Sequence, residues 1–324
     1  MKILVTGGAG YIGGFMTERL VADGHSVVVV DSLERGHKES LVEGITFVQG
    51  NLLDGDFVKE LFSKNKFEVV MHFAAYISVN ESMMEPGLYF RNNVFTTIQL
   101  LDAMRAHDVK NFIFSSTGTV YGTPKTQPIP ETHTKSPENP YAESKLMVEN
   151  ILKWYQQAYG IGFAVLRYFN ASGAALDGSR GETHDPETHL IPCAINAALE
   201  NKEFVLYGDD YPTPDGTCVR DYIHVLDLVE AHMLTLAKLK KENGAYTYNV
   251  GTGKGSSNKD ILAAVKKISN SNFPIIIKER REGDVAETVA DVAKIQAELG
   301  FVAKYSDLET IISSAWKWHT KSNI

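Results

Sequence analysis

Tyr141 and Lys145 are the two residues whose types and spacing best suit acid–base chemistry. They stand four residues apart in the run PYAESK at 140–145, so on a helix both side chains lie on one face, roughly 5–6 Å apart at Cβ. The pKa of a phenol is near 10 in water, and roughly 4 kcal/mol of preferential stabilisation of the anion would bring it to neutrality. A neighbouring ammonium favours that anion. The pair is a candidate general base, although the spacing also occurs where a tyrosine packs beside a snorkelling lysine.

Glycines near the N-terminus form a second group with chemical meaning. A buried strand at 2–6 is followed by the run GGAGYIGG at 7–14, a helical run, and a β-branched strand that ends in Asp31. The glycines permit a tight turn and a close approach of the backbone to a pyrophosphate at the helix N-terminus. Asp31 lies eighteen residues after Gly13, where a carboxylate can accept from ribose hydroxyls. Because this carboxylate would repel a 2′-phosphate, the motif predicts NAD rather than NADP.

Strands and helices alternate through the first half of the chain. We expect further strands at 45–49, 68–74, 111–116 and 162–168, and helices at 56–64, 86–107 and 140–159. This alternation predicts a doubly wound parallel sheet, whose ligands bind at the carboxyl ends of the strands. Asp31, Ser115–Thr117 and Asn170 fall at such ends. We interpret His72, inside an expected strand, as a core histidine.

The pattern changes after Asn170. Irregular loops cover 171–188 and 209–220, and the run DYIH at 221–224 is expected to open a helix that reaches residue 240. Further elements are expected as strands at 246–250 and 275–278, helices at 260–269 and 307–319, and a charged loop at 280–284. We therefore expect a dinucleotide-binding domain over 1–170 and a smaller mixed α/β domain over 171–324, with segments near 223–250 packing back on the first.

Composition narrows the class of protein. The 324 residues carry a net charge of −8, which argues against nucleic acid as the main partner because phosphate binding needs a basic field. Cys193 and Cys218 form neither a disulfide framework nor a metal spacing, and we expect two free thiols in a reducing compartment. No apolar run reaches membrane-spanning length. We expect a cytoplasmic protein with no membrane partner.

Longer motifs identify a family. They are VTGGAGYIG at 5–13, NFIFSSTGTVYG at 111–122, PYAESKLMVE at 140–149, LRYFN at 166–170, HDPETHLIP at 184–192, YGDDYPTPDGTCVRDYIHV at 207–225, YNVGTG at 248–253 and RREGD at 280–284. Together they resemble the extended short-chain dehydrogenase/reductase family and, within it, the UDP-glucose (UDP-galactose) 4-epimerases. The resemblance implies a Rossmann-type fold, NAD as cofactor and a UDP-sugar substrate. It also implies a homodimer through helices 86–107 and 140–159, to which Met104, Met147, Leu152 and Tyr155 would contribute.

The resemblance implies a reaction as well. UDP-glucose and UDP-galactose would interconvert reversibly through a 4-keto sugar. Tyr141, as phenolate, would remove the proton of the 4-hydroxyl, and Lys145 would lower the pKa of Tyr141 and bond the nicotinamide ribose. Thr117 would hydrogen-bond the 4-oxygen. Thr288 stands where some members carry a bulky tyrosine, so we expect UDP-N-acetylglucosamine and UDP-N-acetylgalactosamine to be epimerised too.

The glycine motif and the resemblance together assign contacts to many residues. The cofactor contacts are Gly7, Gly10, Tyr11, Ile12, Gly13, Asp31, Ser32, Asn51, Leu52, Phe73, Ala74, Ala75, Asn92, Ser115, Tyr141, Lys145 and Tyr168. The substrate contacts are Thr117, Tyr141, Asn170, His189, Leu190, Val205, Leu206, Tyr207, Arg220, Arg281, Asp284 and Thr288. The guanidinium forks of the two arginines suit a diphosphate.

Several positions depart from other members. Asn51 stands where an adenine-contacting aspartate is common, and Ile77 replaces a lysine near the cofactor phosphates, which removes one electrostatic contact. His189 replaces an asparagine, and both side chains can donate. The group His184, Asp185 and His189 has metal-ligating side chains, but we expect substrate contact there and no metal.

Alternative functions remain. A nucleotide-sugar 4,6-dehydratase shares the fold, but its dehydration needs an acid and a base just after the threonine, where this chain has Gly118 and Thr119. A 4-epimerase of UDP-xylose or UDP-glucuronate stays open. So does a non-catalytic NAD-binding protein, against which the presence of Tyr141, Lys145 and Thr117 together argues.

Overall fold

The chain folds into two compact units in a computed structural model that describes residues 1–184, 186–281 and 283–322. The first unit comprises Met1–Gly122, Thr134–Arg167 and Ala231–Tyr248. The second comprises Thr123–His133, Tyr168–Glu230 and Asn249–Ile324.

A seven-stranded sheet forms the centre of the first unit, in the order β11-β6-β5-β4-β1-β2-β3. The strands are β1 (Lys2–Thr6), β2 (Ser26–Asp31), β3 (Thr46–Gln49), β4 (Val69–His72), β5 (Asn111–Thr117), β6 (Gly162–Tyr168) and β11 (Ala245–Val250). Neighbours from β3 to β5 pair in parallel, with Thr6 of β1 opposite both Val30 and His72. The order reverses between β1 and β4, which is where open α/β sheets bind their ligands. The predicted doubly wound, Rossmann-type fold is confirmed.

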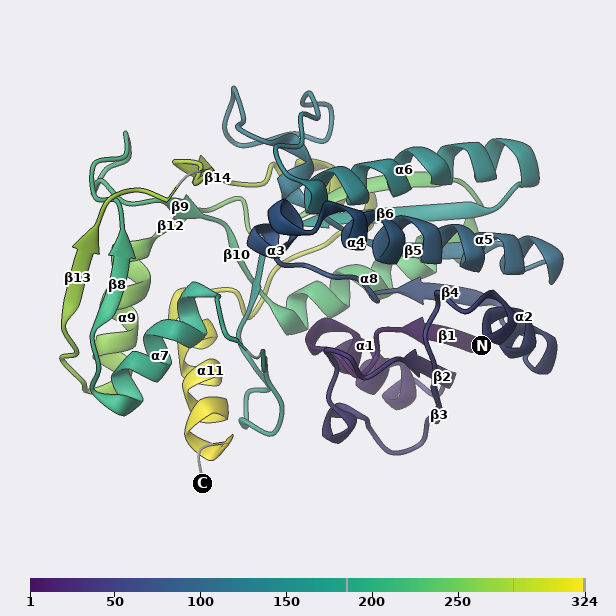
Figure 1. The fold of residues 1–324 in the computed structure, drawn as a ribbon, viewed down its shortest axis with the longest axis horizontal. Helices are drawn as coiled ribbons and strands as arrows, with labels where there is room; N and C mark the ends of the chain where they lie inside the picture. Colours follow the sequence, from purple (N-terminus) through teal and green to yellow (C-terminus); the bar gives the residue numbers. More distant parts are fainter. Residues whose placement is uncertain (185, 282, 323–324) are drawn as a thin grey trace. The chain divides into compact units, whose positions relative to one another are not determined.

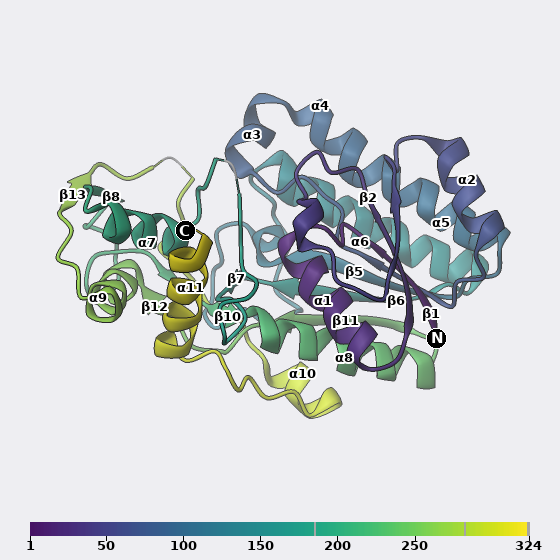
Figure 2. The same ribbon diagram turned by 90° about the horizontal axis from the view of Figure 1, so that it is seen from below.

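Helices cover both faces of this sheet. They are α1 (Tyr11–Ala22), α2 (Gly55–Lys64), α3 (Val79–Met84), α4 (Pro86–Tyr89), α5 (Thr96–Ala106), α6 (Pro140–Tyr159) and α8 (Val225–Lys241), with a π-helical segment η2 (Phe90–Phe95) and short 3-10 turns η1 (Lys38–Ser40) and η3 (Gly118–Tyr121). Figures 1 and 2 show α4, α5 and α6 on one face, and α1 with α8 on the other. Leu4, Val28 and Val70 pack with Leu61 and Leu101 in one buried cluster, and the alternate residues Ile3, Val29 and Met71 are buried as well. Both sheet faces are therefore apolar, as parallel sheets require.

The described residues of the second unit form three small sheets and a core of their own. The sheets are β10 (Tyr222–His224) with β7 (Asn170–Ser172), β12 (Ser256–Ser257) with β9 (Val219–Arg220) and β14 (Glu287–Thr288), and β13 (Ile275–Lys278) with β8 (Phe204–Tyr207). The helices are α7 (Leu190–Glu200), α9 (Asn258–Ser269), α10 (Ala293–Leu299) and α11 (Leu308–Ser322). Ile195, Ile261 and Ile312 are fully buried in a cluster shared by α7, α9 and α11.

Two of the expected elements differ in type from the sequence-based expectation. Residues 222–224, expected to open a helix, form β10 and pair in parallel with β7, and α8 begins only at Val225. The carboxylate of Asp221 accepts from the backbone N–H groups of Thr252 and Gly253 instead of capping a helix, so tertiary pairing overrides the local helical pattern. The expected helix 86–107 is continuous in direction but contains η2, a π segment of the kind often found near functional sites.

No helix among the described residues is long and apolar enough to span a membrane.

Candidate active site

Helix α6 places Tyr141 in its first turn. The Asn139 side chain caps the helix by accepting the Ala142 N–H at 2.9 Å, and Pro140 occupies the first helical position, where its missing N–H costs nothing. Gly160 ends the helix in the left-handed conformation. The partial positive charge of a helix N-terminus favours an anionic side chain nearby, so this placement assists a phenolate.

Thr117, at the end of β5, hydrogen-bonds the Tyr141 phenol. Burial raises the pKa of Tyr141 to about 12, and the hydrogen bond from Thr117 acts in the opposite direction. The Thr117 hydroxyl also lies 3.0 Å from the hydroxyl of Thr119. The structure therefore brings together the phenol and the hydroxyl that the sequence assigned to one sugar oxygen.

Lys145 is buried one turn further along α6. Its ammonium donates to the carbonyl of Ser115 at 2.9 Å and lies 4.9 Å from the centre of the Phe114 ring. Burial lowers the pKa of Lys145 to about 7. Burial and Thr117 are the influences on the phenol, so the expectation that Lys145 lowers the pKa of Tyr141 stays a prediction.

Asn93 is a positioning residue that the sequence analysis missed. Its side-chain oxygen accepts the Tyr76 N–H at 2.9 Å, and its amide nitrogen donates to the Tyr76 carbonyl and to the Ser144 hydroxyl, each at 3.0 Å. Ser144 in turn donates to the carbonyl of Tyr141. This one buried amide therefore links the segment after β4 to the catalytic turn of α6.

His72 is a buried core histidine, as expected. Nδ1 lies 2.7 Å from the Thr6 hydroxyl and Nε2 lies 3.0 Å from the Thr97 hydroxyl. Because Thr97 donates to the carbonyl of Asn93, its hydroxyl must accept from Nε2, which fixes the tautomer. Burial and the charge of Lys145 lower the pKa of His72 to about 3, so the imidazole is neutral.

A buried ion pair supports the back of the same site. Arg167 on β6 donates from Nε and Nη2 to Glu149 on α6, and from Nη1 to the Tyr121 hydroxyl. Glu149 also accepts from Ser116 at 2.7 Å. Both charged side chains are at most 3% exposed. The network joins α6 to the end of β5, next to Thr117. The sequence analysis did not predict this network, because its members are far apart in the chain.

The glycine loop fits a dinucleotide. Gly7 has a φ of +74°, and a Cβ there would lie 2.5 Å from the Ala74 nitrogen, while a Cβ on Gly13 would lie 2.2 Å from the Gly7 carbonyl oxygen. Gly10 is the N-cap of α1, so the helix terminus carries no side chain that would shield it from an anion. Asp31 accepts from the N–H groups of Ala9 and Leu33 at 3.0 and 2.9 Å, which hold its carboxylate while lone pairs remain for ribose hydroxyls.

The remaining predicted cofactor residues lie mainly around the carboxyl ends of the first unit's strands. These are Tyr11, Ile12, Ser32, Asn51, Leu52, Phe73, Ala74, Ala75, Asn92 and Ser115, whereas Tyr168 belongs to the second unit. Asn51 donates to Glu34 at 3.0 Å, and Ile77 is 46% exposed.

Arg35, the cation nearest to Asp31 in sequence, already has partners. Its guanidinium donates to Glu81 at 2.6 Å and stacks 4.8 Å over the Tyr76 ring. The Tyr76 hydroxyl donates to Glu34. A paired arginine beside two carboxylates is a poor site for a 2′-phosphate, which agrees with NAD.

The predicted substrate residues of the second unit gather on its short strands and loops. Arg220 of β9 stands opposite Thr288 of β14. Asn170 donates from its side chain to the carbonyl of Asp221 at 3.1 Å. Val205 and Leu206 lie with Tyr207 on β8.

The charged loop joins this group. Arg281 stacks 5.0 Å over the Tyr207 ring and pairs with Asp284 at 3.2 Å. Its charge also acts on Cys193 of α7, the helix that His189 caps and Leu190 begins. Thr117 and Tyr141 lie in the first unit and the other substrate residues in the second.

Asp221 is a further residue that sequence reasoning missed. It is fully buried, and its carboxylate accepts from the hydroxyl and N–H of Thr252 and the N–H groups of Gly253 and Ala290. Burial raises its pKa, and these hydrogen bonds oppose the rise. These hydrogen bonds hold the strand that carries Arg220 in place. In the sequence, only the position of Asp221 next to Arg220 indicated that it belongs to the site.

Comparison with known proteins agrees with this geometry. The NAD dependent epimerase/dehydratase family matches residues 3–251. A UDP-glucose 4-epimerase of Streptococcus mutans is 47% identical over 323 residues, which cover 99% of this chain and 97% of the relative.

Solved structures are similar over the whole chain. The crystal structure of UDP-glucose 4-epimerase from Brucella ovis in complex with NAD has a TM-score of 0.94, with 44% identity and 98% of each chain covered. The UDP-glucose 4-epimerase from Bifidobacterium longum in complex with NAD+ and UDP has a TM-score of 0.94 and 37% identity, covering 100% of this chain and 99% of that one. The resemblance drawn from the motifs is confirmed. The chain belongs to the NAD dependent epimerase/dehydratase family.

Proposed function

We propose that this protein is an NAD-dependent 4-epimerase that interconverts UDP-glucose and UDP-galactose. The observation that carries the proposal is the group formed by Tyr141, Thr117 and Lys145 beside a glycine loop shaped for a dinucleotide. Full-length similarity to UDP-glucose 4-epimerases supports it. The same similarity does not favour the alternatives, a 4-epimerase of UDP-xylose or UDP-glucuronate and a non-catalytic protein.

The residues of the chain itself transfer one proton in this reaction. NAD, when bound, would supply a hydride acceptor and donor at C4 of the sugar, so that no net oxidation occurs. Tyr141 Oη would take the proton of the 4-hydroxyl and later return it. Thr117 hydrogen-bonds the 4-oxygen, and Lys145 contributes positive charge from the same helix face. Fixed placement of these groups avoids much of the entropic cost of bringing them together.

The nucleotide part of the substrate would be held by the second unit. Arg220 and Arg281 offer guanidinium forks to the diphosphate. The remaining assigned contacts are Asn170, His189, Leu190, Val205, Leu206, Tyr207, Asp284 and Thr288. We also propose a cofactor domain over 1–170, on which segments near 223–250 pack back, and a substrate domain over 171–324; the place of Ala231–Tyr248 in the first unit supports this division.

The sugar range would extend to N-acetylated sugars. Thr288 is a short side chain opposite Arg220 in the sheet, where some members of the family carry tyrosine. Turnover of UDP-galactose with none of UDP-N-acetylgalactosamine would refute this extension.

A homodimer through the face formed by α5 and α6 is also proposed. Two of the residues first assigned to it are corrected: Met104 and Leu152 are at most 1% exposed because they pack in the core of the first unit. Exposed apolar side chains on α6 and at the end of η2 include Phe95, Met147, Trp154 and Tyr159. The free thiols of Cys193 and Cys218 support a reducing compartment, the cytoplasm.

Isotope transfer tests the function. UDP-galactose carrying deuterium at C4 should yield UDP-glucose with the deuterium still at C4, without added NAD. Tyr141→Phe should lose at least about a thousandfold in turnover, within the usual range for removal of a general base, while its cofactor stays bound. Tyr159→Phe, at the exposed end of the same helix, should turn over normally. Deuterium released into water would disprove the proposed reaction.

A further inference from the structure

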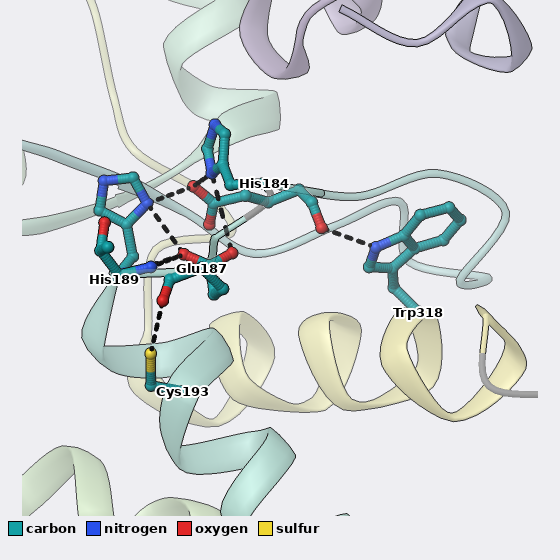
Figure 3. Close-up of polar contacts among 7 residues, drawn as sticks. His184, Glu187, His189, Cys193 and Trp318 are labelled. Atoms are coloured by element: carbon teal, nitrogen blue, oxygen red, sulfur yellow. Dashed lines mark hydrogen bonds and ion pairs between the residues drawn. The ribbon is translucent and has the colours of Figure 1, made fainter. Parts of the chain in front are cut away.

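Four metal-ligating side chains meet in the loop before α7, within the second unit. They are Glu182, His184, Glu187 and His189, and their ligand atoms all lie within 4.8 Å of one another. Figure 3 shows one ring nitrogen of His184 and of His189 directed at the two carboxylates. None of the four takes part in the proton transfer at Tyr141.

The spacing is that of a tetrahedral site. Zinc binds imidazole nitrogen at 2.0–2.1 Å and carboxylate oxygen at 2.0–2.2 Å, which places adjacent ligand atoms about 3.3 Å apart. His184 Nδ1 lies 3.2 Å from Glu182 Oε1 and 3.7 Å from Glu187 Oε2. His189 Nδ1 lies 2.8 Å from Glu182 Oε1 and 3.4 Å from Glu187 Oε1. These four separations, which involve one carboxylate oxygen of Glu182 and both of Glu187, lie on either side of the tetrahedral value.

The cluster is largely buried, which distinguishes it from a surface ion pair. The side chains of Glu182 and Glu187 are 8% and 12% exposed, whereas that of His189 is 50% exposed, which leaves an entry path. Among the described residues, the buried Nδ1 of His184 has no hydrogen bond of acceptable geometry, although carboxylate oxygens surround it. A buried nitrogen aimed at oxygens without bonding them needs an explanation, and a cation among the four atoms provides one.

Charge balance favours a divalent ion. Two carboxylates and two neutral imidazoles carry a charge of −2, which one divalent cation cancels. Metal binding requires both imidazoles to be neutral, so the ion itself would cancel this charge.

The cluster is anchored from outside. Trp318 of α11 donates to the backbone carbonyl of Glu182 at 2.9 Å, and the Cys193 thiol of α7 donates to that of Glu187 at 3.6 Å. Glu187 accepts the N–H of His189 at 2.8 Å. Two helices therefore hold the ligands in place before any ion binds. This reduces the conformational entropy that the loop would lose on binding.

We propose that Glu182, His184, Glu187 and His189 form a zinc site at the start of α7. Four nitrogen and oxygen ligands in tetrahedral spacing suit zinc. Coordination through Nδ1 places the proton of His189 on Nε2, which remains a hydrogen-bond donor. Zinc binding would therefore leave His189 able to donate to the substrate, as proposed above.

Metal content tests the proposal directly. The NAD-bound full-length protein, without a histidine tag, is treated with a chelator, equilibrated with one equivalent of zinc and desalted. One zinc per chain by mass spectrometry is expected, with X-ray absorption showing only nitrogen and oxygen ligands at about 2.0–2.2 Å. Less than a tenth of an equivalent, or a sulfur ligand, would overturn the site.

Variants separate this site from stray zinc binding. His184→Asn and Glu187→Gln keep hydrogen-bonding groups but remove ligands, so the zinc affinity measured by chelator competition should fall at least tenfold. His107→Asn, at an exposed histidine of the first unit, should bind zinc as the wild type does. Equal affinity in all three would reject the assignment. Should a variant fail to fold, the stoichiometry and absorption spectrum of the wild type still decide.

Discussion

Burial opposes the charges that the catalytic pair needs. It raises the pKa of Tyr141 to about 12 and lowers that of Lys145 to about 7. Both shifts favour uncharged side chains, because a low-dielectric site penalises either ion. The local influences that favour the phenolate are the Thr117 hydrogen bond and the N-terminus of α6.

Asn93 should be essential for placing this pair. Asn93→Ala removes four side-chain hydrogen bonds and leaves the partly buried Tyr76 N–H without its acceptor, which we expect to cost about 2–3 kcal/mol of the free energy of unfolding. Turnover should fall more than substrate affinity does, because α6 loses its tie to the segment after β4. Urea denaturation and steady-state kinetics measure the two effects. Asn150→Ala, on the exposed side of α6, is the control, and equal behaviour of the two variants would contradict the positioning role.

His72 should make stability depend on pH. Its pKa of about 3 in the folded chain lies below the usual 6.5, so the unfolded chain binds the extra proton between these values, and stability is lost as the pH falls through this window. Between pH 6.5 and 5 the loss is about 1.6 kcal/mol. His72→Gln should lose correspondingly less over that range in urea denaturation. His107→Gln, at an exposed position, should follow the wild type. A parallel loss in His72→Gln would contradict the assignment to His72.

Residues of the site differ in how far sequence could reveal them. Tyr141, Lys145 and the glycines belong to local patterns whose spacing has a physical meaning. Asn93 and Asp221 do not: Asn93 bonds Ser144, and Asp221 bonds Ala290, across 51 and 69 residues of chain. Only the folded chain brings such partners together, and the periodicity of the sequence does not reveal them.

At the scale of elements, the loop between β1 and α1 depends on bare backbone. A Cβ on Gly13 would lie 2.2 Å from the Gly7 carbonyl oxygen, so Gly13→Ala must displace the turn that would hold the pyrophosphate. We expect NAD affinity to fall at least tenfold, measured by cofactor content after dialysis. Gly87→Ala in α4 meets only the Arg91 side chain, at 3.6 Å or more, and should keep the cofactor with unchanged or slightly higher melting temperature. Full retention of NAD in Gly13→Ala would show that the turn tolerates the methyl group.

Elements with a strong local pattern were predictable. All seven strands of the central sheet appear where apolar runs end in polar residues, and α6 has the predicted bounds because its cap, proline and glycine are local signals. β10 was not predictable, since its residues become a strand only by pairing with β7. The short β9, β12 and β14 have two residues each, too few for a period to show.

At the scale of the whole molecule, each unit closes its own core, and in the first unit apolar side chains on η2 and α6 remain exposed. Phe95, Met147 and Trp154 are 48%, 39% and 68% exposed. Met147 and Trp154 are seven residues apart on α6, so they share one helix face. Aromatic residues and methionine are enriched in protein interfaces, and exposed apolar patches mark such surfaces.

Trp154→Glu should therefore convert a dimer into a monomer. A carboxylate at the centre of an apolar interface would be buried without a partner, twice per dimer, and the burial of an unpaired charge is strongly unfavourable. Sedimentation velocity should give about twice the chain mass for the wild type and the chain mass for the variant. Val302→Glu makes the same kind of change at an apolar side chain that is 62% exposed in the second unit, and it should remain dimeric. A wild type that sediments as a monomer, or a Trp154→Glu variant that stays dimeric, would place the interface elsewhere or exclude it.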